Sequence, residues 1–296
     1  MAIIPLLKFI TNHPLNRDRK AEALMRFARW QLASRAFPAD IVCEWVNGAR
    51  FFARNGETGL TQNIYTGLQE FPDMAYVLHV LRSTDLFVDI GANVGSYTIL
   101  ACKGVGASGI AVEPIPATYI RLQENIRLNR LENTVVCLNI GIGEAAGTIR
   151  FTDSLDTVNH ALANGESDVG TIDVQVSMLD GIMKDNAPSL IKIDVEGYET
   201  PVLKGAAETL QKASLHSVIM ELNGSGARYN YQESKILDMM LDHGFATYTY
   251  EPFTRSLKKL KGKSLQSGNT LFIRDVDHVT ERLRAAPKIN VLGKEL

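Results

Sequence analysis

From residue 86 onward, short apolar runs alternate with longer stretches in which apolar residues recur at helical spacing. Runs that are apolar on both faces are typical of strands buried in a parallel sheet. Strands that alternate with helices along a chain form doubly wound α/β sheets. The pattern therefore predicts an α/β fold with parallel strands at residues 86–90, 109–113, 134–140, 190–196 and 217–222.

The segments between and after these strands complete the prediction. Helices are expected at 97–103, at 116–129 (with Ile120, Leu122 and Ile126 on one side), at 200–211 and at 232–243, where Gly244 is a C-cap. A hairpin-like excursion at 148–151 precedes a polar loop. Strands at 245–250 and 270–273 have no helix between them, so they are expected to pair antiparallel.

The first 80 residues read differently from the rest. A helix is predicted at 19–36, two short strands around the Asn-Gly turn within 45–56, and a further helix at 72–82. We therefore divide the chain into an N-terminal helical and hairpin cap (1–80), an α/β domain (81–280) and a C-terminal tail (281–296).

Composition excludes several classes of protein. The 296 residues are 45% hydrophobic and 22% charged, which is ordinary for a globular protein, and the net charge of −2 argues against nucleic acid as the main partner. Cys43, Cys102 and Cys137 lack metal-ligand spacing, so a reduced, cytoplasmic setting fits best. The apolar segment 1–10 is too short to span a bilayer and is expected to pack on the protein rather than at a membrane edge.

The glycine-bearing turn after the first strand indicates a loop that binds a nucleotide-like cofactor, because glycine allows a sharp bend and a close approach to a ligand. The dinucleotide fingerprint requires glycine at positions 91, 93 and 96, whereas this chain has Gly91, Asn93 and Ser96. Asn93 would hinder the approach of a pyrophosphate to backbone N–H groups. This disfavours a nicotinamide-dependent oxidoreductase, which stays as an alternative.

Two acids flank this loop. Glu113 ends the second strand 22 positions after Gly91, where a carboxylate accepts hydrogen bonds from ribose hydroxyls, unless it is only an exposed strand end. Asp89 would repel a pyrophosphate but can accept from an ammonium group; alternatively it caps the loop. With Gly91, Asn93 and Gly95, these acids favour S-adenosylmethionine, which carries an ammonium, a ribose and a sulfonium but no phosphate.

Charged residues gather where two later strands end, at the edge where open α/β sheets bind ligands. Lys192, Asp194 and Glu196 point to one face of strand 190–196, and buried charges are costly without partners. Either Lys192 pairs with one of these acids in a structural role, or Asp194 and Glu196 carry chemistry. Glu221 and Asn223 close the next strand at the same rim.

Two further groups have open interpretations. His160 lies in the polar loop 156–160, which is expected over the same rim; imidazole exchanges protons near neutral pH and suits a general base, although a loop histidine is usually just exposed. The basic run in the predicted loop 255–263 is either solvated or contacts an anionic or membrane-linked substrate. Its members are Arg255, Lys258, Lys259, Lys261 and Lys263.

Three stretches together resemble the FkbM family of S-adenosylmethionine-dependent methyltransferases: 87–98, Glu113 with Pro114, and 191–199 with its run Lys-Ile-Asp-Val-Glu-Gly. Segments 200–205 and 219–222 continue the likeness, which covers about residues 85–250. The resemblance implies a Rossmann-like class I methyltransferase fold, with a mostly parallel seven-stranded sheet and one antiparallel strand. It also implies O-methylation of a sugar or polyketide hydroxyl.

On this interpretation the chain is an O-methyltransferase that uses S-adenosyl-L-methionine and a small-molecule or glycan acceptor. Asp194 and Glu196 are the first catalytic candidates, with His160 as an alternative base. Whether Asp194, Glu196 or Glu221 binds a divalent metal ion stays open, as do the oligomeric state and the alternative of a non-catalytic cofactor-binding protein. The predicted cofactor contacts are Tyr65 (with Thr61 nearby), Asp89, Gly91, Asn93, Gly95, Ser96, Glu113, Pro114, Ile140 and Asp194.

Overall fold

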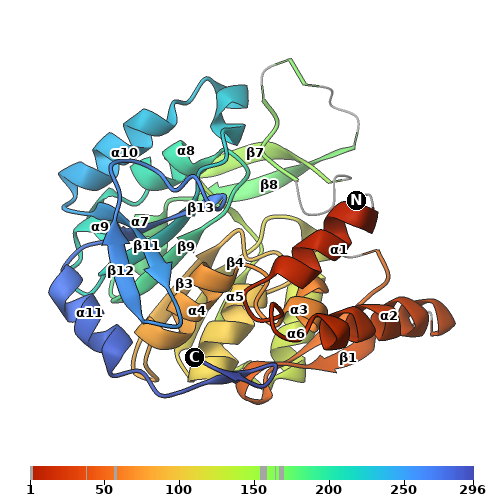
Figure 1. Ribbon diagram of the computed structural model, residues 1–296. Coiled ribbons are helices and arrows are strands. Elements are labelled where there is room, and N and C mark those ends of the chain that lie inside the picture. Colours follow the sequence, from red (N-terminus) through yellow and green to blue (C-terminus); the bar gives the residue numbers. More distant parts are fainter. Residues whose placement is uncertain (1–2, 38, 57–58, 154–158, 164, 167–169) are drawn as a thin grey trace.

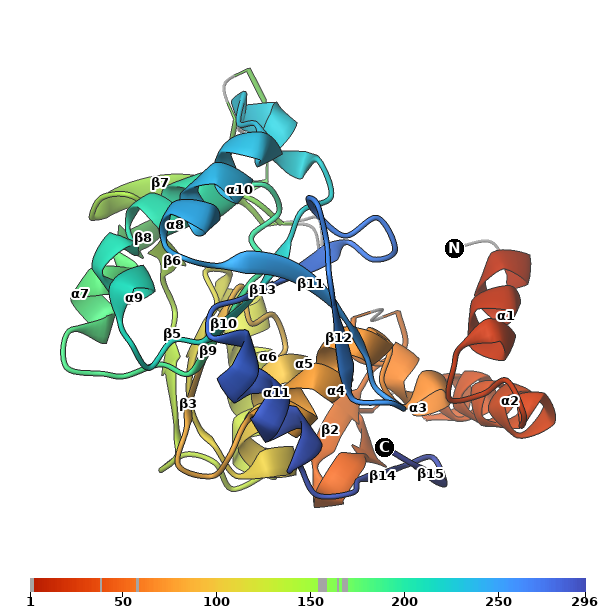
Figure 2. The ribbon, with the colours of Figure 1, turned by 60° about the vertical axis from the view of Figure 1, so that its left-hand side comes forward.

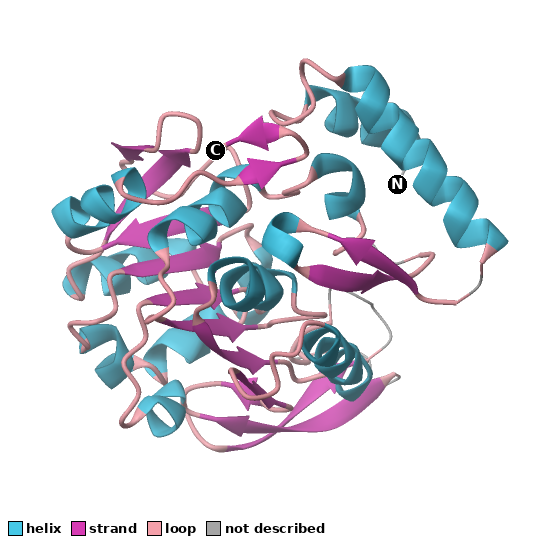
Figure 3. Cartoon of the chain, turned by 90° about the horizontal axis from the view of Figure 1, so that it is seen from below, coloured by secondary structure: helices cyan, strands magenta, loops and turns pink. Residues whose placement is uncertain are grey.

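The computed structural model describes residues 3–37, 39–56, 59–153, 159–163, 165–166 and 170–296. Within these residues eight strands form one sheet in the order β12-β11-β13-β10-β9-β3-β4-β5, with helices on both faces (Figure 1, Figure 3). The strands are β3 (Leu86–Ile90), β4 (Ser108–Val112), β5 (Val135–Leu138), β9 (Leu190–Ile193), β10 (Ser217–Glu221), β11 (Ala246–Glu251), β12 (Ser256–Lys259) and β13 (Asn269–Ile273).

The sheet confirms the predicted α/β fold. The strands β10, β9, β3, β4 and β5 are parallel neighbours, and β13 lies antiparallel between β10 and β11. These seven strands match the expected sheet with one antiparallel strand. β12 adds an edge strand that pairs with β11, so the prediction of a plain loop over 255–263 is wrong at Lys258 and Lys259.

Successive strand residues point to opposite faces of the sheet, and helices pack on each face, so residues on both faces are buried. Phe87 belongs to a core cluster shared with α4 (Phe71–Val80), α5 (Ser96–Ile99), α6 (Pro116–Leu128) and α11 (Val276–Arg284). Val88, its neighbour in β3, belongs to a second cluster on the other face, shared with α7 (Leu179–Met183), α8 (Glu199–Lys204), α9 (Ala207–Gln211) and α10 (Glu233–Asp242). This explains the unbroken apolar runs of the sequence.

Three local predictions are corrected by tertiary contacts. The expected helix 200–211 is broken into α8 and α9, because the carbonyl of Gly205 accepts a hydrogen bond from the Asp180 N–H (3.0 Å). The expected strand 190–196 ends at Ile193, and the positive φ of Glu196 (53°) turns the chain away. Ile120 is 54% exposed, although Leu122 and Ile126 on the same helix are buried as expected.

The N-terminal cap docks one of its strands onto the α/β domain. It comprises α1 (Ile3–Asn12), α2 (Lys20–Ala36), β1 (Ile41–Glu44), the turn η1 (Val46–Gly48), β2 (Arg50–Ala53) and α3 (Gln62–Thr66), with α1 and α2 at one side of the molecule (Figure 2). The side chains of Asn125 on α6 and of Asn129, which caps its end, accept hydrogen bonds from the N–H groups of Phe52 (2.9 Å) and Arg50 (2.8 Å). The predicted antiparallel strand pair around the Asn-Gly turn is present, but its first strand is 41–44, before the predicted range 45–56, and α6 covers the edge of β2.

The apolar first segment packs only in part. Ile10 is buried, whereas Ile3 and Ile4 are 61% and 65% exposed. No helix of the described chain has both the length and the apolar character needed to cross a bilayer. The cytoplasmic setting stays a prediction.

The remaining elements are short and lie outside the large sheet. A small sheet of order β6-β8-β7 is made by β6 (Gly141–Ile142), β7 (Gly147–Thr152) and β8 (Thr171–Ser177); the last strands are β14 (Asn290–Val291) and β15 (Lys294–Glu295), and single turns are η2 (Leu100–Val105) and η4 (Ser225–Tyr229). The Arg255 guanidinium donates to the carbonyls of Pro287 (2.9 Å) and Leu296 (3.0 Å), which fixes the C-terminal segment. The division of the chain at residues 80 and 280 stays a prediction, and α11 crosses position 280.

Candidate cofactor and active site

The turn after β3 has the backbone conformation that its glycines suggested. Gly91, Asn93 and Gly95 all have positive φ angles, of 78°, 50° and 92°. Asparagine is one of the few residues with a side chain that tolerates this conformation, because its short polar side chain can bond locally. The Asn93 side chain accepts from the Val94 N–H at 2.7 Å. Asn93 therefore makes the same backbone turn that a glycine would make.

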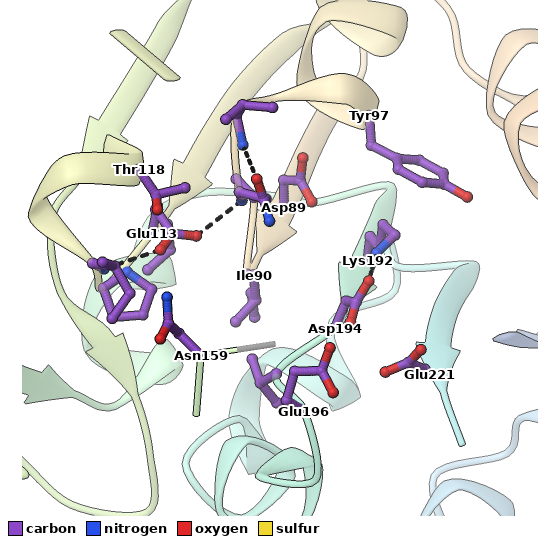
Figure 4. Close-up of a pocket in the computed structure, with 18 of the residues that line it drawn as sticks. Asp89, Ile90, Tyr97, Glu113, Thr118, Asn159, Lys192, Asp194, Glu196 and Glu221 are labelled. Atoms are coloured by element: carbon purple, nitrogen blue, oxygen red, sulfur yellow. Dashed lines mark hydrogen bonds and ion pairs between the residues drawn. The ribbon is translucent and has the colours of Figure 1, made fainter. Parts of the chain in front are cut away.

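Glu113 lies directly after β4 and faces this turn (Figure 4). Its Oε2 accepts from the Asn93 N–H (2.9 Å) and its Oε1 from the Ile115 N–H (3.0 Å). The side chain is only 6% exposed, and burial raises its pKa to about 7 although both N–H groups lower it. A carboxylate has about four acceptor positions, so each oxygen keeps a lone pair for a ligand hydroxyl.

Asp89 is buried inside β3, opposite Lys192 in the register of β3 and β9. Its carboxylate accepts a hydrogen bond from the Thr98 hydroxyl at 2.6 Å, and burial raises its pKa against the lowering effect of Lys192. Asp89 also lines the cavity described below. It therefore both fixes the helix that follows the turn and contributes a buried acid to the cavity.

Lys192 is paired, as one of the two interpretations of the sequence expected. Its Nζ lies 2.6 Å from Asp194 Oδ2 and 4.7 Å from the ring centroid of Tyr97. Burial lowers the pKa of Lys192, but the carboxylates of Asp194, Glu70 and Asp89 outweigh it and raise the pKa overall. The buried ammonium is thus charged and holds the Asp194 carboxylate in one orientation.

Three carboxylates meet at the ends of β9 and β10. Oxygen atoms of Asp194, Glu196 and Glu221 all lie within 4.8 Å of one another, on the opposite side of the cavity from Glu113 (Figure 4). Burial raises the pKa of Glu221 to about 9, and the charges of Asp194 and Glu196 add to this effect. Such a cluster can take a cation, a hydrogen-bond donor or a proton.

A cavity of about 210 Å³ joins these groups. The turn and Glu113 form one side of it and the carboxylate cluster the other. Its lining includes the predicted residues Asp89, Gly91, Asn93, Ser96, Glu113, Pro114, Ile140, Asp194, Glu196 and Glu221. It also includes Gln69, Glu70, Tyr97, Thr118, Phe151, Asn159 and Tyr198, which the sequence analysis did not select.

Some of these missed residues had a sequence signal. Thr118 lies in the first turn of the helix that follows Glu113, so it faces the same space as the strand end. Tyr97 opens the helix after the turn, where its ring packs beside Lys192. Glu70 has no such signal, because the cap brings it to Tyr97, whose hydroxyl donates to Glu70 Oε2 at 2.6 Å.

Three predicted contacts are placed elsewhere by the fold. Tyr65 packs in the core of the cap, with its ring 5.5 Å from that of Phe27, and Thr61 is buried near it in the cap. Gly95 is the N-cap of α5, with Leu122 close to its Cα, and shapes the turn from behind. These residues belong to the scaffold around the cavity.

His160 also lies outside the cavity lining. The residue is 7% exposed, and its Nε2 lies 3.3 Å from Glu166. The neighbouring Asn159 points into the cavity instead (Figure 4). The structure therefore places His160 beside the cavity rather than in its lining, and its role as an alternative base stays a prediction.

Comparison with known proteins gives consistent results. The sequence profile of the family described as Methyltransferase FkbM domain matches residues 89–247, more than half of the chain. The hexuronic acid methyltransferase AglP of Haloferax volcanii is 31% identical over 153 residues, covering 50% of this chain and 59% of AglP. The methyltransferase sdnD of Sordaria araneosa is 26% identical over 209 residues, covering 59% of this chain and 79% of sdnD.

Among solved structures, the precorrin-6y C5,15-methyltransferase of Geobacter metallireducens superposes with a TM-score of 0.42 at 12% identity. The match covers 75% of this chain and 92% of that one. At this TM-score the superposition supports no conclusion about activity. Among the relatives compared by sequence, the match spans 59% of the length of AglP and 79% of the length of sdnD.

Proposed function

Because this chain belongs to the FkbM methyltransferase domain family, we propose that it is an S-adenosylmethionine-dependent O-methyltransferase that acts on a hydroxyl of a sugar or glycan. The class of acceptor is suggested by the similarity to AglP, a hexuronic acid methyltransferase. One observation carries the proposal. The Glu113 carboxylate and the cluster Asp194, Glu196 and Glu221 line opposite sides of one cavity.

The turn side of the cavity fits the cofactor. Glu113 keeps lone pairs for the two ribose hydroxyls, and Gly91 lets the turn pack directly against the Asp194 carbonyl, whose oxygen a Cβ would overlap. The Asp89 carboxyl, which also lines the cavity, can accept a hydrogen bond from the ammonium group. When bound, S-adenosylmethionine supplies a methyl group whose carbon is electrophilic because it is attached to a positively charged sulfur.

The carboxylate side fits the acceptor hydroxyl. Lys192 fixes the Asp194 carboxylate at 2.6 Å, so one Asp194 oxygen is held while the other is left for the acceptor. With S-adenosylmethionine bound, Asp194 would accept the proton that the acceptor hydroxyl loses in methyl transfer. Much of the rate enhancement comes from holding the two reactants in line in this cavity.

Calorimetry with S-adenosylmethionine tests the cofactor assignment. We expect micromolar binding of S-adenosylmethionine and of its demethylated product, and no measurable binding of NAD, because Asn93 and the acids leave no site for a pyrophosphate. Tight NAD binding without S-adenosylmethionine binding would show that the proposed function is wrong. Transfer of a labelled methyl group to a panel of glycans then identifies the acceptor.

We expect Glu113→Gln to weaken S-adenosylmethionine binding by roughly ten- to a hundredfold, the value of one or two charge-assisted hydrogen bonds. The pKa of Glu113 is raised to about 7, mainly by burial and also by the charges of Asp89 and Asp194. Since the ionised form accepts ribose hydroxyls best, the affinity of the native protein should rise as the pH increases through about 7.

The raised pKa of Glu113 also decides whether the stability of the fold rises or falls with pH. The pKa in the fold lies above the ordinary value of 4.5, so the stability contributed by Glu113 is complete below pH 4.5 and is lost as the pH rises through 7. Calorimetric titrations between about pH 6 and 8 measure the affinity, and denaturant melts between about pH 4 and 8 measure the stability. A pH profile of affinity that stays unchanged in Glu113→Gln would remove Glu113 from the ribose site.

A further inference from the structure

A second hollow of about 490 Å³ lies between α1, the start of α4, β11 and the loop before β13. Gln69 and Glu70 line both this hollow and the cofactor cavity, so the two spaces meet at these residues. The Glu70 carboxylate accepts from the Tyr97 hydroxyl at 2.6 Å, which holds it at the junction. The hollow therefore opens toward the side of the cavity that also holds Lys192 and Asp194.

The junction presents a buried hydrogen-bond acceptor that lacks a donor. Gln69 Oε1 is buried and has no hydrogen-bond partner among the described residues. Asp73, 6% exposed, has an Asn269 amide 3.3 Å away as its donor. An unpaired buried acceptor costs free energy, which a ligand that brings O–H donors would recover.

The walls of the hollow combine flat rings with few positive charges. Phe9, Phe71, Tyr248 and Tyr250 contribute aromatic surface, against which apolar faces of a ligand can lie. Lys8 is the single lysine or arginine among the described residues of the lining. His13 is neutral at pH 7, because burial lowers its pKa to about 4.

We propose that this hollow is the acceptor subsite and that it takes a neutral, hydroxyl-rich saccharide whose reacting hydroxyl passes Gln69 and Glu70 toward Asp194. Aromatic rings lie against the sugar ring, and Gln69 Oε1, Glu70 and Asp73 accept from its hydroxyls. An anionic sugar is disfavoured, because its carboxylate would lie near Glu70, and Lys8 is the single lysine or arginine among the described lining residues. The inference rests on the proposed function for the direction of the reacting hydroxyl, but binding of the saccharide does not depend on it.

The test uses ligand-observed NMR on the full chain with a panel of methyl glycosides of neutral hexoses and the matching methyl hexuronides. We expect at least one neutral glycoside to bind, its hexuronide to bind about tenfold more weakly, and Gln69→Leu to weaken the neutral glycoside by about tenfold. Gln211→Leu, the same change at an exposed position on α9, is the matched control and should leave binding unchanged.

A second variant guards against misfolding of Gln69→Leu. Asn12 is exposed on α1 and lines the hollow, so Asn12→Ala should keep the fold and weaken binding by about threefold. The proposal is overturned if no neutral glycoside binds, if the hexuronide binds as well or better, or if both variants bind like the native protein. S-adenosylmethionine affinity, measured on the same samples, should stay within about twofold in Asn12→Ala, because Asn12 lines the hollow and not the cofactor cavity. If the native protein does not bind S-adenosylmethionine, the proposed function is refuted, and the saccharide result is still interpretable.

Discussion

Asp194→Asn is expected to lower the rate of methyl transfer by about 10²- to 10⁴-fold, the usual effect of losing a general base. The amide keeps the shape of the side chain but cannot accept the acceptor's proton. S-adenosylmethionine affinity should stay within about threefold, because Glu113 and the turn at Gly91 are on the other side of the cavity. Single-turnover methyl transfer and calorimetry on the same preparation measure the two quantities.

Two controls make this result specific. Asp173→Asn is the same chemical change at an exposed carboxylate that faces Arg150, and it should leave turnover unchanged. The assay repeated with a strong chelator separates a proton acceptor from a metal ligand. We expect activity to persist, because Lys192, 2.6 Å from Asp194, already supplies a positive charge there. Loss in chelator with recovery in Mg²⁺ would assign Asp194 to a metal site, and full activity of Asp194→Asn would remove it from catalysis.

Gly91→Ala is expected to destabilise the fold by about 3 kcal/mol and to weaken S-adenosylmethionine binding by about 100-fold. Gly91 has a φ of 78°, and a Cβ there would overlap the backbone carbonyl oxygen of Asp194. That carbonyl cannot move freely, because the Asp194 N–H is bonded to the Ile90 carbonyl at 2.9 Å. Relief of the overlap must therefore displace the turn that faces Glu113.

Gly48→Ala is the matched control for this prediction. Gly48 has a φ of 75°, and a Cβ there would meet nothing within 4 Å. The control therefore carries only the cost of a left-handed alanine, about 1–2 kcal/mol, and cofactor affinity should be unchanged. Denaturant melts give both free energies of unfolding. Equal losses for the two variants would show that the approach of Asp194 to Gly91 is not the constraint.

The strands and the cofactor turn were predictable because their signals are local. An apolar run over Leu86–Ile90, followed by Gly91, Asn93 and Gly95, specifies a buried strand and a turn with positive φ whatever the rest of the chain does. The position of Glu113 followed from the same logic, since the end of a neighbouring parallel strand falls at the same edge of the sheet. Family membership, shown by the profile match over 89–247, rests on these same local motifs.

The predicted residues that lie outside the cavity lining are those whose partners no sequence pattern reveals. Tyr65 was expected near the cofactor because it precedes the turn in sequence, but its ring packs on Phe27 of α2. His160 was expected over the rim, but its Nε2 lies 3.3 Å from Glu166 and its backbone N–H donates to the Thr152 hydroxyl. In loops and caps, packing sets the direction of each side chain, and no periodicity records that choice.

The sequence by itself determined the parallel sheet, the turn at Gly91 to Gly95 and the family. It also determined that Glu113 and Asp194 lie at the carboxyl edge of the sheet. Only the tertiary structure decided that Lys192 is paired with Asp194, and that Glu70 and Gln69 from the cap join the cofactor cavity to a second hollow. The physical reason is the range of the forces involved. Strand and turn formation is fixed by neighbours in the chain, whereas the ion pair and the junction require segments that meet only when the sheet and cap are assembled.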